Sequence, residues 1–184
     1  MMIGIVGKGT MRKGIVQLLS QSQFVSSVKW LGRPGELDDK PLLELKRQWA
    51  RQVLKNKITS STASVYGEKI ILAKTFSDFA DCSAVLEAVS EDKESKKSVF
   101  EGLANVVGPT TILASNTSSF SITELASYAK YPENVVGLHF FNPAMVMKLT
   151  EVIHGMSTSK STIEWALDFS KKMGKDPVLV NEAP

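Results

Sequence analysis

The sequence contains very few of the residues that build disulfide frameworks or metal sites. Its 184 residues include one cysteine, Cys82, and two histidines. A single cysteine excludes an internal disulfide framework and a cysteine-based metal centre. The histidines and carboxylates show no spacing typical of a metal ligand set. We therefore expect no bound metal and a reducing compartment, which indicates a cytoplasmic protein.

Long apolar runs and a strong charge of one sign are missing as well. No run of 18 apolar residues occurs, so no membrane-spanning helix is expected. The opening MMIGIVG carries no positive charge ahead of its apolar stretch, which argues against a signal peptide. The formal net charge is only +3, too mild to predict binding to nucleic acid. The expected partners are small molecules, with no nucleic acid and no membrane.

Segments typical of strands alternate with segments typical of helices along the chain. This alternation predicts an α/β fold with a Rossmann-type, doubly wound, mostly parallel sheet. We expect residues 1–184 to form one dinucleotide-binding domain, with a helical pair inserted after the second strand and an antiparallel edge strand at 146–155. The expected strands are 2–6, 26–31, 69–74, 83–89, 110–115, 134–141, 146–155 and 177–181. The expected helices are 10–20, 36–57, 60–67, 92–107, 121–129 and 158–174.

A glycine-rich turn, GIVGKGTMRKG, follows the first expected strand. Gly7 is placed to make the tight turn, and Gly9 lets the backbone approach a pyrophosphate at the N-terminus of the helix that Thr10 and Met11 open. The position of the third glycine holds Arg12. We expect its guanidinium to swing outward, towards the phosphates.

The end of the second strand, WLGRPGE, lacks the acid that usually holds the ribose hydroxyls of NAD. Gly32 and Arg33 stand there instead, and an arginine suits the 2′-phosphate of NADP. Together with Lys8 and Arg12 it would make a positive pocket. The cofactor is therefore expected to be NAD or NADP, with NADP favoured. A plain strand-to-helix turn without ligand, with Arg33 solvated, remains the alternative.

Polar side chains gather after two other strands. The stretch SNTSS follows the strand at 110–115, and His139 lies at the end of the strand at 134–141. Alternation in the next strand puts Glu151 on an otherwise apolar face, where a carboxylate needs a partner. His139 is the obvious candidate. A histidine paired with a carboxylate beside hydroxyl groups is typical of an oriented general base.

Four motifs of the sequence together resemble a known protein family. GKGTM, EAVSEDKESKKSVF, SNTSSFSI and GLHFFNPAMVMKLTEVI resemble, in this order, the NAD-binding domain of the 3-hydroxyacyl-CoA dehydrogenase family. The resemblance covers nearly the whole chain. It implies an oxidoreductase that oxidises the 3-hydroxyl of an acyl-CoA and passes hydride to a nicotinamide. It also implies a further helical domain, absent from this chain, that closes the cleft and makes a homodimer, so the isolated domain is expected to turn over poorly.

The resemblance implies roles for individual residues. His139 matches the general base, and Glu151 matches the carboxylate that orients it. Ser118 matches a serine that hydrogen-bonds the reacting oxygen, and Asn116 an amide near the nicotinamide.

Other residues match the cofactor and coenzyme A sites. Glu91 matches an acid near the cofactor. The region that contacts the phosphates of coenzyme A is matched by Lys96 and by a basic helical segment around Arg51, Lys55 and Lys57.

Two other functions stay open. The GRP at the end of the second strand is similar to the NRT of NADP-dependent dehydrogenases of small 3-hydroxy acids. Arg12 and the missing second domain favour a non-catalytic cofactor-binding protein.

Overall fold

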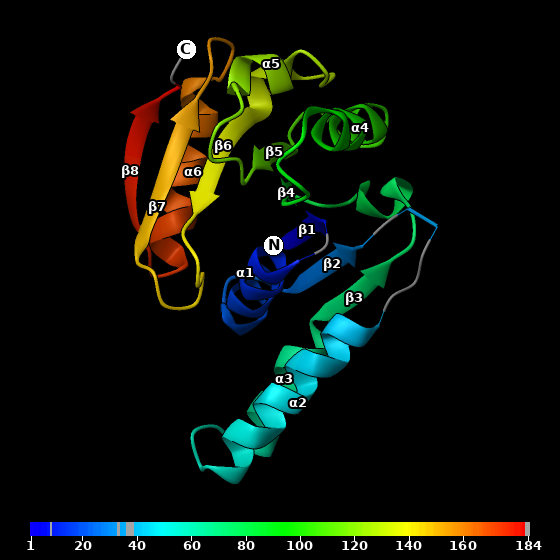
Figure 1. The fold of residues 1–184 in the computed structure, drawn as a ribbon, viewed down its shortest axis with the longest axis vertical. Coiled ribbons are helices and arrows are strands. Elements are labelled where there is room, and N and C mark those ends of the chain that lie inside the picture. Colours follow the sequence, from blue (N-terminus) through cyan, green and yellow to red (C-terminus); the bar gives the residue numbers. More distant parts are fainter. Residues whose placement is uncertain (8, 33, 36–38, 183–184) are drawn as a thin grey trace.

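The computed structural model describes residues 1–7, 9–32, 34–35 and 39–182. Within these residues the strands form one sheet in the order β3-β2-β1-β4-β5-β6-β7-β8 (Figure 1). The strands are β1 (Met2–Val6), β2 (Ser27–Leu31), β3 (Ile70–Ala73), β4 (Ala84–Glu87), β5 (Ile112–Ser115), β6 (Val135–Phe140), β7 (Leu149–His154) and β8 (Asp176–Asn181). The helices are α1 (Thr10–Gln21), α2 (Lys40–Leu54), α3 (Ser60–Glu68), α4 (Lys93–Ala104), α5 (Ile122–Ala126) and α6 (Lys160–Lys172), with short 3₁₀ turns at Phe76–Phe79 and Pro132–Asn134.

The predicted doubly wound topology is confirmed. Strands β1 to β6 are all parallel, and β1 lies between β2 and β4. The order of the strands therefore reverses at β1, and in such sheets ligands bind at the carboxyl ends of the strands beside this reversal. Strand β4 is buried along its whole length, as expected for a parallel strand covered on both faces.

The sheet reverses direction at β7, which is antiparallel to β6, as predicted. However, β7 is not the edge strand, because β8 pairs parallel to it and lies outside it. The alternation of β7 buries Thr150 and Val152 completely and leaves the face of Glu151 partly open. The predicted edge position was wrong because the short last strand could not be assigned a partner from its own sequence.

Two apolar layers cover the sheet. One contains residues of α1, α2 and α6, such as Leu19, Trp49 and Phe169. The other contains residues of α4 and α5, such as Phe100 and Leu125. No helix in the described part of the chain has the length and apolarity needed to cross a membrane.

The predicted helical insertion is confirmed as a hairpin of α2 and α3 that projects away from the sheet (Figure 1). It is attached through Leu45 and Trp49, which are buried in the core. A cavity of about 690 Å³ lies along the hairpin, lined by both helices and including Lys46 and Trp49. The hairpin thus adds a separate surface to the dinucleotide fold.

Candidate active site and cofactor groove

The glycine-rich turn has the two properties that a dinucleotide requires. Gly7 has φ +139°, and a Cβ there would lie 2.3 Å from the carbonyl oxygen of Ala88, so no side chain fits. Gly9 has φ +120°, and a Cβ there would meet nothing within 4 Å. The backbone is therefore tight against β4 at the first glycine and open at the second, where a pyrophosphate would approach.

The open N-terminus of α1 follows directly. Thr10 and Met11 form its first turn, which contains no acidic residue, and Gly9 in the cap position has no side chain to satisfy the first N–H groups. Such N–H groups attract phosphate. A cavity of about 260 Å³ lies nearby, at the carboxyl ends of β1, β2 and β4, and its lining includes Gly7, Gly32 and Val89. These residues fit a bound dinucleotide.

Arg12 points the other way from the predicted direction. Its side chain is only 4 % exposed, and its guanidinium carbon lies 4.6 Å from the ring centre of Trp30 on β2. A guanidinium stacks well on an indole face, which explains the inward rotamer. The expectation that Arg12 swings out towards phosphates was therefore wrong.

Two further residues of the predicted positive pocket, Lys8 and Arg33, lie outside the described residues. The described lining of the 260 Å³ cavity contains no Asp or Glu. Gly32 follows β2 at the position where NAD-binding domains usually carry an acidic residue.

His139 and Glu151 contact each other as expected. They face each other directly across the antiparallel pair of β6 and β7, and His139 Nδ1 lies 2.8 Å from Glu151 Oε2. The side chains are 17 % and 33 % exposed. The ring of His139 also packs against Phe141, with the centroids 4.6 Å apart. The histidine is therefore held by two neighbours and keeps access to solvent.

Ser118 and Glu151 line the same small cavity of about 140 Å³. Its walls come from the segment after β5, from β7, and from the end of β8 with the residue that follows it. Asn116 lies beside it, because its Oδ1 accepts the N–H of Phe140, next to His139, at 2.8 Å. The structure thus brings the four residues matched to catalysis to the ends of three neighbouring strands.

Glu91 is held by the polar residues after β5. Its Oε1 accepts the Thr117 hydroxyl at 2.5 Å and the Ser118 N–H at 2.9 Å, and its Oε2 lies 2.9 Å from Lys96 Nζ. Although partial burial opposes ionisation, these hydrogen bonds and the ammonium lower the pKa of Glu91 to about 2. Glu91 is therefore ionised at neutral pH and holds the segment after β5 through hydrogen bonds.

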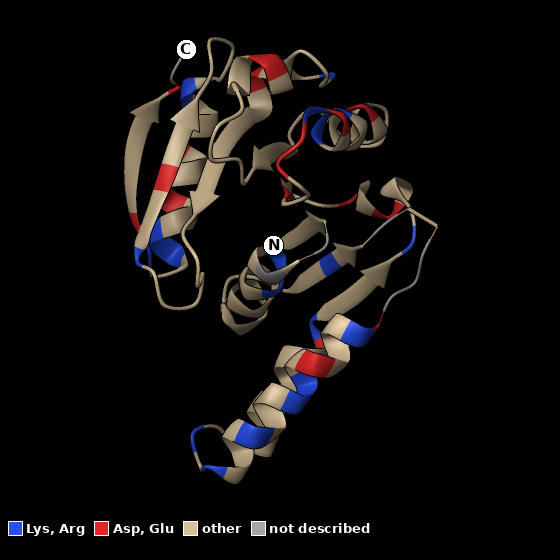
Figure 2. Ribbon diagram, viewed as in Figure 1, with Lys and Arg blue, Asp and Glu red and all other residues tan. Residues whose placement is uncertain are grey.

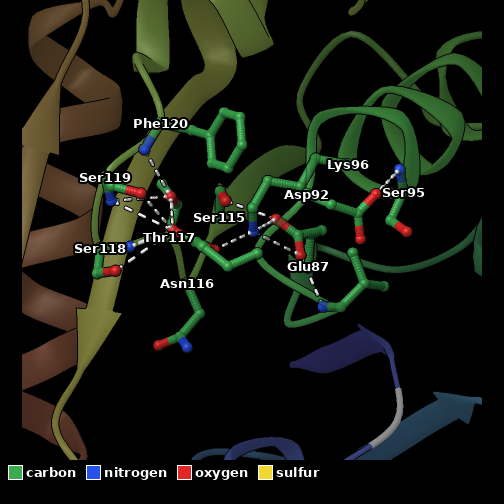
Figure 3. Close-up of polar contacts among 12 residues, drawn as sticks. Glu87, Asp92, Ser95, Lys96, Ser115, Asn116, Thr117, Ser118, Ser119 and Phe120 are labelled. Atoms are coloured by element: carbon green, nitrogen blue, oxygen red, sulfur yellow. Dashed lines mark hydrogen bonds and ion pairs between the residues drawn. The ribbon is translucent and has the colours of Figure 1, made fainter.

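The side chain of Lys96 is buried between two carboxylates. Its side chain is 1 % exposed, and its ammonium pairs with Glu87 at 3.1 Å (Figure 3). The ammonium also lies 2.9 Å from Glu91. Two carboxylates thus enclose its ammonium, and the expected place of Lys96 near phosphates stays a prediction. Glu87 was not singled out from the sequence, although an acid ending an apolar strand, nine residues before a lysine, was a usable signal.

Among the described residues, no group of three or more His, Cys, Asp or Glu could hold a metal ion. Cys82 is buried, and burial raises the pKa of its thiol to about 12. It is therefore neither a nucleophile nor a ligand at neutral pH.

With this geometry in place, comparison with known proteins identifies the family. The sequence model described as the 3-hydroxyacyl-CoA dehydrogenase NAD-binding domain matches residues 2–183. The chain belongs to this family. Similar members include the 3-hydroxybutyryl-CoA dehydrogenase of Clostridioides difficile, which is 39 % identical over all of this chain and 65 % of its own length. A probable 3-hydroxybutyryl-CoA dehydrogenase of Bacillus subtilis is 37 % identical over 99 % of this chain and 63 % of its own length.

Solved structures of 3-hydroxyacyl-CoA dehydrogenases share the fold. The 3-hydroxybutyryl-CoA dehydrogenase of Escherichia coli superposes with a TM-score of 0.92 at 34 % identity, covering all of this chain and 38 % of that protein. The (S)-3-hydroxybutyryl-CoA dehydrogenase of Ralstonia eutropha gives 0.91 at 32 % identity and covers 64 % of that protein. This chain therefore spans between 38 % and 65 % of the length of these relatives.

Proposed function

We propose that this chain is the cofactor-binding part of an oxidoreductase that transfers hydride between the 3-hydroxyl carbon of an acyl-CoA and a nicotinamide. The observation that carries the proposal is the 2.8 Å contact of His139 Nδ1 with Glu151, beside the cavity that Ser118 lines. Family membership supports the same reaction.

Each residue has its own role in the proposed reaction. With Nδ1 facing Glu151, the other ring nitrogen of His139 is free to accept the proton of the 3-hydroxyl. Glu151 orients the imidazole and stabilises the cation that this transfer creates. Ser118 would hydrogen-bond the reacting oxygen, and Asn116, whose Oδ1 accepts the N–H of Phe140, would lie beside the nicotinamide. The nicotinamide, when bound, supplies the hydride acceptor.

Coenzyme A is proposed to contact the helical hairpin. Arg51, Lys55 and Lys57 are all exposed at its far end, and Figure 2 shows basic residues along α2. A row of exposed cations suits the phosphates of a coenzyme. The large cavity between α2 and α3 offers apolar surface next to them.

For the cofactor we propose NADP rather than NAD. The support is the absence of an acid from the described lining of the cavity at the end of β2, together with Arg33 in the sequence. The whole protein is proposed to be a cytoplasmic homodimer that completes its cleft with a further helical domain.

A parallel fluorescence titration of this chain with NADPH and NADH tests the proposal. We expect both to bind, NADPH more tightly. Arg33→Asp is expected to reverse the preference, with a change in relative Kd of roughly tenfold, the size of one strong charged contact. Arg51→Asp, which alters an exposed arginine on the hairpin, serves as the control and should leave the ratio unchanged.

Four results would count against the proposal. Equal affinities that Arg33→Asp leaves unchanged would remove Arg33 from the cofactor site. Binding of neither nucleotide would favour the non-catalytic alternative, as would binding without any oxidation of 3-hydroxybutyryl-CoA by the chain or by its full-length form. Oxidation of free 3-hydroxy acids in preference to their thioesters would favour the small-substrate alternative.

A further inference from the structure

Lys175 is a buried cation in the turn between α6 and β8, and the proposed reaction does not use it. The residue is only 6 % exposed. Its ammonium donates hydrogen bonds to two backbone carbonyls, that of Ala144 and, at 2.8 Å, that of Met147. Burial and, to a smaller degree, the ammonium of Lys148 lower the pKa of Lys175. Both acceptors are neutral, so the cation is costly to bury and its two hydrogen bonds offset that cost.

The two carbonyls belong to the loop of residues 141–148, which joins β6 to β7 (Figure 1). Inside this loop the carbonyl of Pro143 accepts the N–H groups of Val146 and Met147 at 2.9 and 3.0 Å. Lys175 holds the loop at two points and joins it to the connection between α6 and β8. Together these hydrogen bonds keep the backbone of the loop in one shape.

One side of the loop lies against α1. Ala144 is 2 % exposed, and a Cβ added at Gly14 of α1 would lie 3.3 Å from the Cβ of Ala144. Gly14 is about one helical turn beyond Thr10, the first residue of this helix. The N-terminus of α1 is the expected site of the pyrophosphate. The loop therefore passes about one turn of helix from the place where the phosphates would bind.

The other side of the loop reaches the general base. Phe141 begins the loop, and its ring packs on that of His139 with the centroids 4.6 Å apart. In the proposed reaction the hydride leaves the carbon whose hydroxyl His139 deprotonates, so the nicotinamide has to lie next to His139. The pyrophosphate of the same cofactor has to lie at α1. Because the loop runs from His139 to α1, it is placed to border the nicotinamide half of the groove.

We propose that Lys175 is a positioning residue for the nicotinamide: by holding the carbonyls of Ala144 and Met147 it fixes the loop that borders the ring, and so sets the position of the ring relative to the carbon that gives up the hydride. The inference rests on the proposed function, because it needs a nicotinamide beside His139. Lys175 acts through the backbone of the loop and contacts neither cofactor nor substrate.

Lys148 offers a matched control at the same loop. Its ammonium donates to the carbonyl of Gly174 at 3.1 Å, and so joins the loop to the same turn from the exposed side. Lys148→Met therefore removes an ammonium and one hydrogen bond between the two segments, while the carbonyls of Ala144 and Met147 keep their donor.

The first test compares, by isothermal titration calorimetry, the binding of NADH with that of ADP-ribose, which has the same adenosine and pyrophosphate but no nicotinamide. Lys175→Met is expected to weaken NADH binding about 5- to 10-fold and to leave the Kd of ADP-ribose within about twofold. The reason is that only molecules with the loop in place can accept the ring. Lys148→Met should change neither Kd. Equal losses for both ligands, or no loss of NADH affinity, would overturn the proposal.

A second variant keeps the test decisive if Lys175→Met does not fold. Lys175→Gln keeps N–H donors but is uncharged and shorter, so one amide cannot hold both carbonyls at their present positions. The same selective loss of NADH affinity is expected, and equal losses for NADH and ADP-ribose would again overturn the proposal.

Amide hydrogen exchange of the free chain tests the loop without a cofactor. The amides of Val146 and Met147 are both hydrogen-bonded within the loop. They are expected to exchange about tenfold faster or more in Lys175→Met than in Lys148→Met, with the Val152 amide of β7 unchanged. Unchanged exchange in the loop, or equal acceleration at Val152, would overturn the positioning role.

Turnover separates a failure of this inference from a failure of the proposed reaction. With 3-hydroxybutyryl-CoA, Lys175→Met is expected to lower kcat by about 10- to 100-fold with the KM of the thioester within about twofold, because a misplaced ring slows the chemical step. A higher KM of the thioester with kcat unchanged would overturn the positioning role. A wild-type protein that oxidises no 3-hydroxyacyl-CoA would defeat the proposed reaction, whereas the comparison of NADH with ADP-ribose would still decide the role of Lys175. A wild-type protein that binds neither ligand would overturn both.

Discussion

Two side-chain pairs of this molecule, one between β4 and α4 and one between β6 and β7, differ mainly in their access to water. Glu87 and Lys96 are sealed, with 2 % and 1 % of their side chains exposed, whereas His139 and Glu151 keep 17 % and 33 %. A sealed pair cannot exchange protons with a substrate, but it can fix its surroundings. A half-open pair costs less to form and leaves a ring nitrogen accessible. Burial therefore separates a residue that holds the site from one suited to proton transfer.

The sealed pair should dominate stability. Lys96→Ala leaves Glu87 charged in the interior without its cation, and is expected to lower the free energy of unfolding by about 3–5 kcal/mol. Urea denaturation measures this loss. Lys97→Ala, on the exposed side of α4, is the matched control, with an expected change within about 0.5 kcal/mol. A Lys96→Ala loss as small as that of the control would mean that the pair is not sealed in solution.

The open pair should dominate turnover instead. His139→Gln is expected to reduce kcat by about 10²- to 10⁴-fold, the usual contribution of a positioned general base. Its effect on unfolding should stay within about 1 kcal/mol, because the pair is partly solvated. Steady-state kinetics and urea denaturation of the same preparation measure the effect on kcat and the effect on unfolding. A variant that keeps most of its activity would remove His139 from the role of base, and cofactor affinity within a few fold of the wild type would show that the groove is intact.

Glu91 lies between these extremes, and its effect is best measured as a pH dependence of stability. Its folded pKa, about 2, is below the ordinary value of 4.5. Its contribution to stability is therefore complete above about pH 4.5 and is lost as the pH falls through 2. Glu91→Gln should flatten the stability profile between pH 5 and 2, as measured by thermal unfolding. A profile as steep as that of the wild type would mean that other carboxylates carry the acid sensitivity.

Much of this arrangement was predictable from local patterns. The positions of the strands and helices follow from apolar periodicity and agree with the structure to within a few residues. The contact of His139 with Glu151 followed from one carboxylate on an otherwise apolar strand face and one nearby histidine. These features depend on neighbours in the sequence or on adjacent strands.

What could not be predicted depends on distant packing. Arg12 of α1 turns inward because Trp30, 18 residues away on β2, offers an aromatic face. Lys96 is enclosed because the turn after β4 folds Glu87, at the end of that strand, and Glu91, four residues later, onto α4; only the spacing of Glu87 and Lys96 was a signal in the sequence. The edge position fell to β8 rather than β7 because pairing in a sheet is decided between strands.

The antiparallel register of β6 and β7 has a consequence for how the chain can misfold. His139 lies opposite Glu151 in this register. A slip of one residue would carry Glu151 to the other face of the sheet, where Thr150 and Val152 are now buried. The 2.8 Å contact therefore forms only in the correct strand register. A chain that pairs β6 and β7 in the wrong register loses this side-chain pair as well as its native fold.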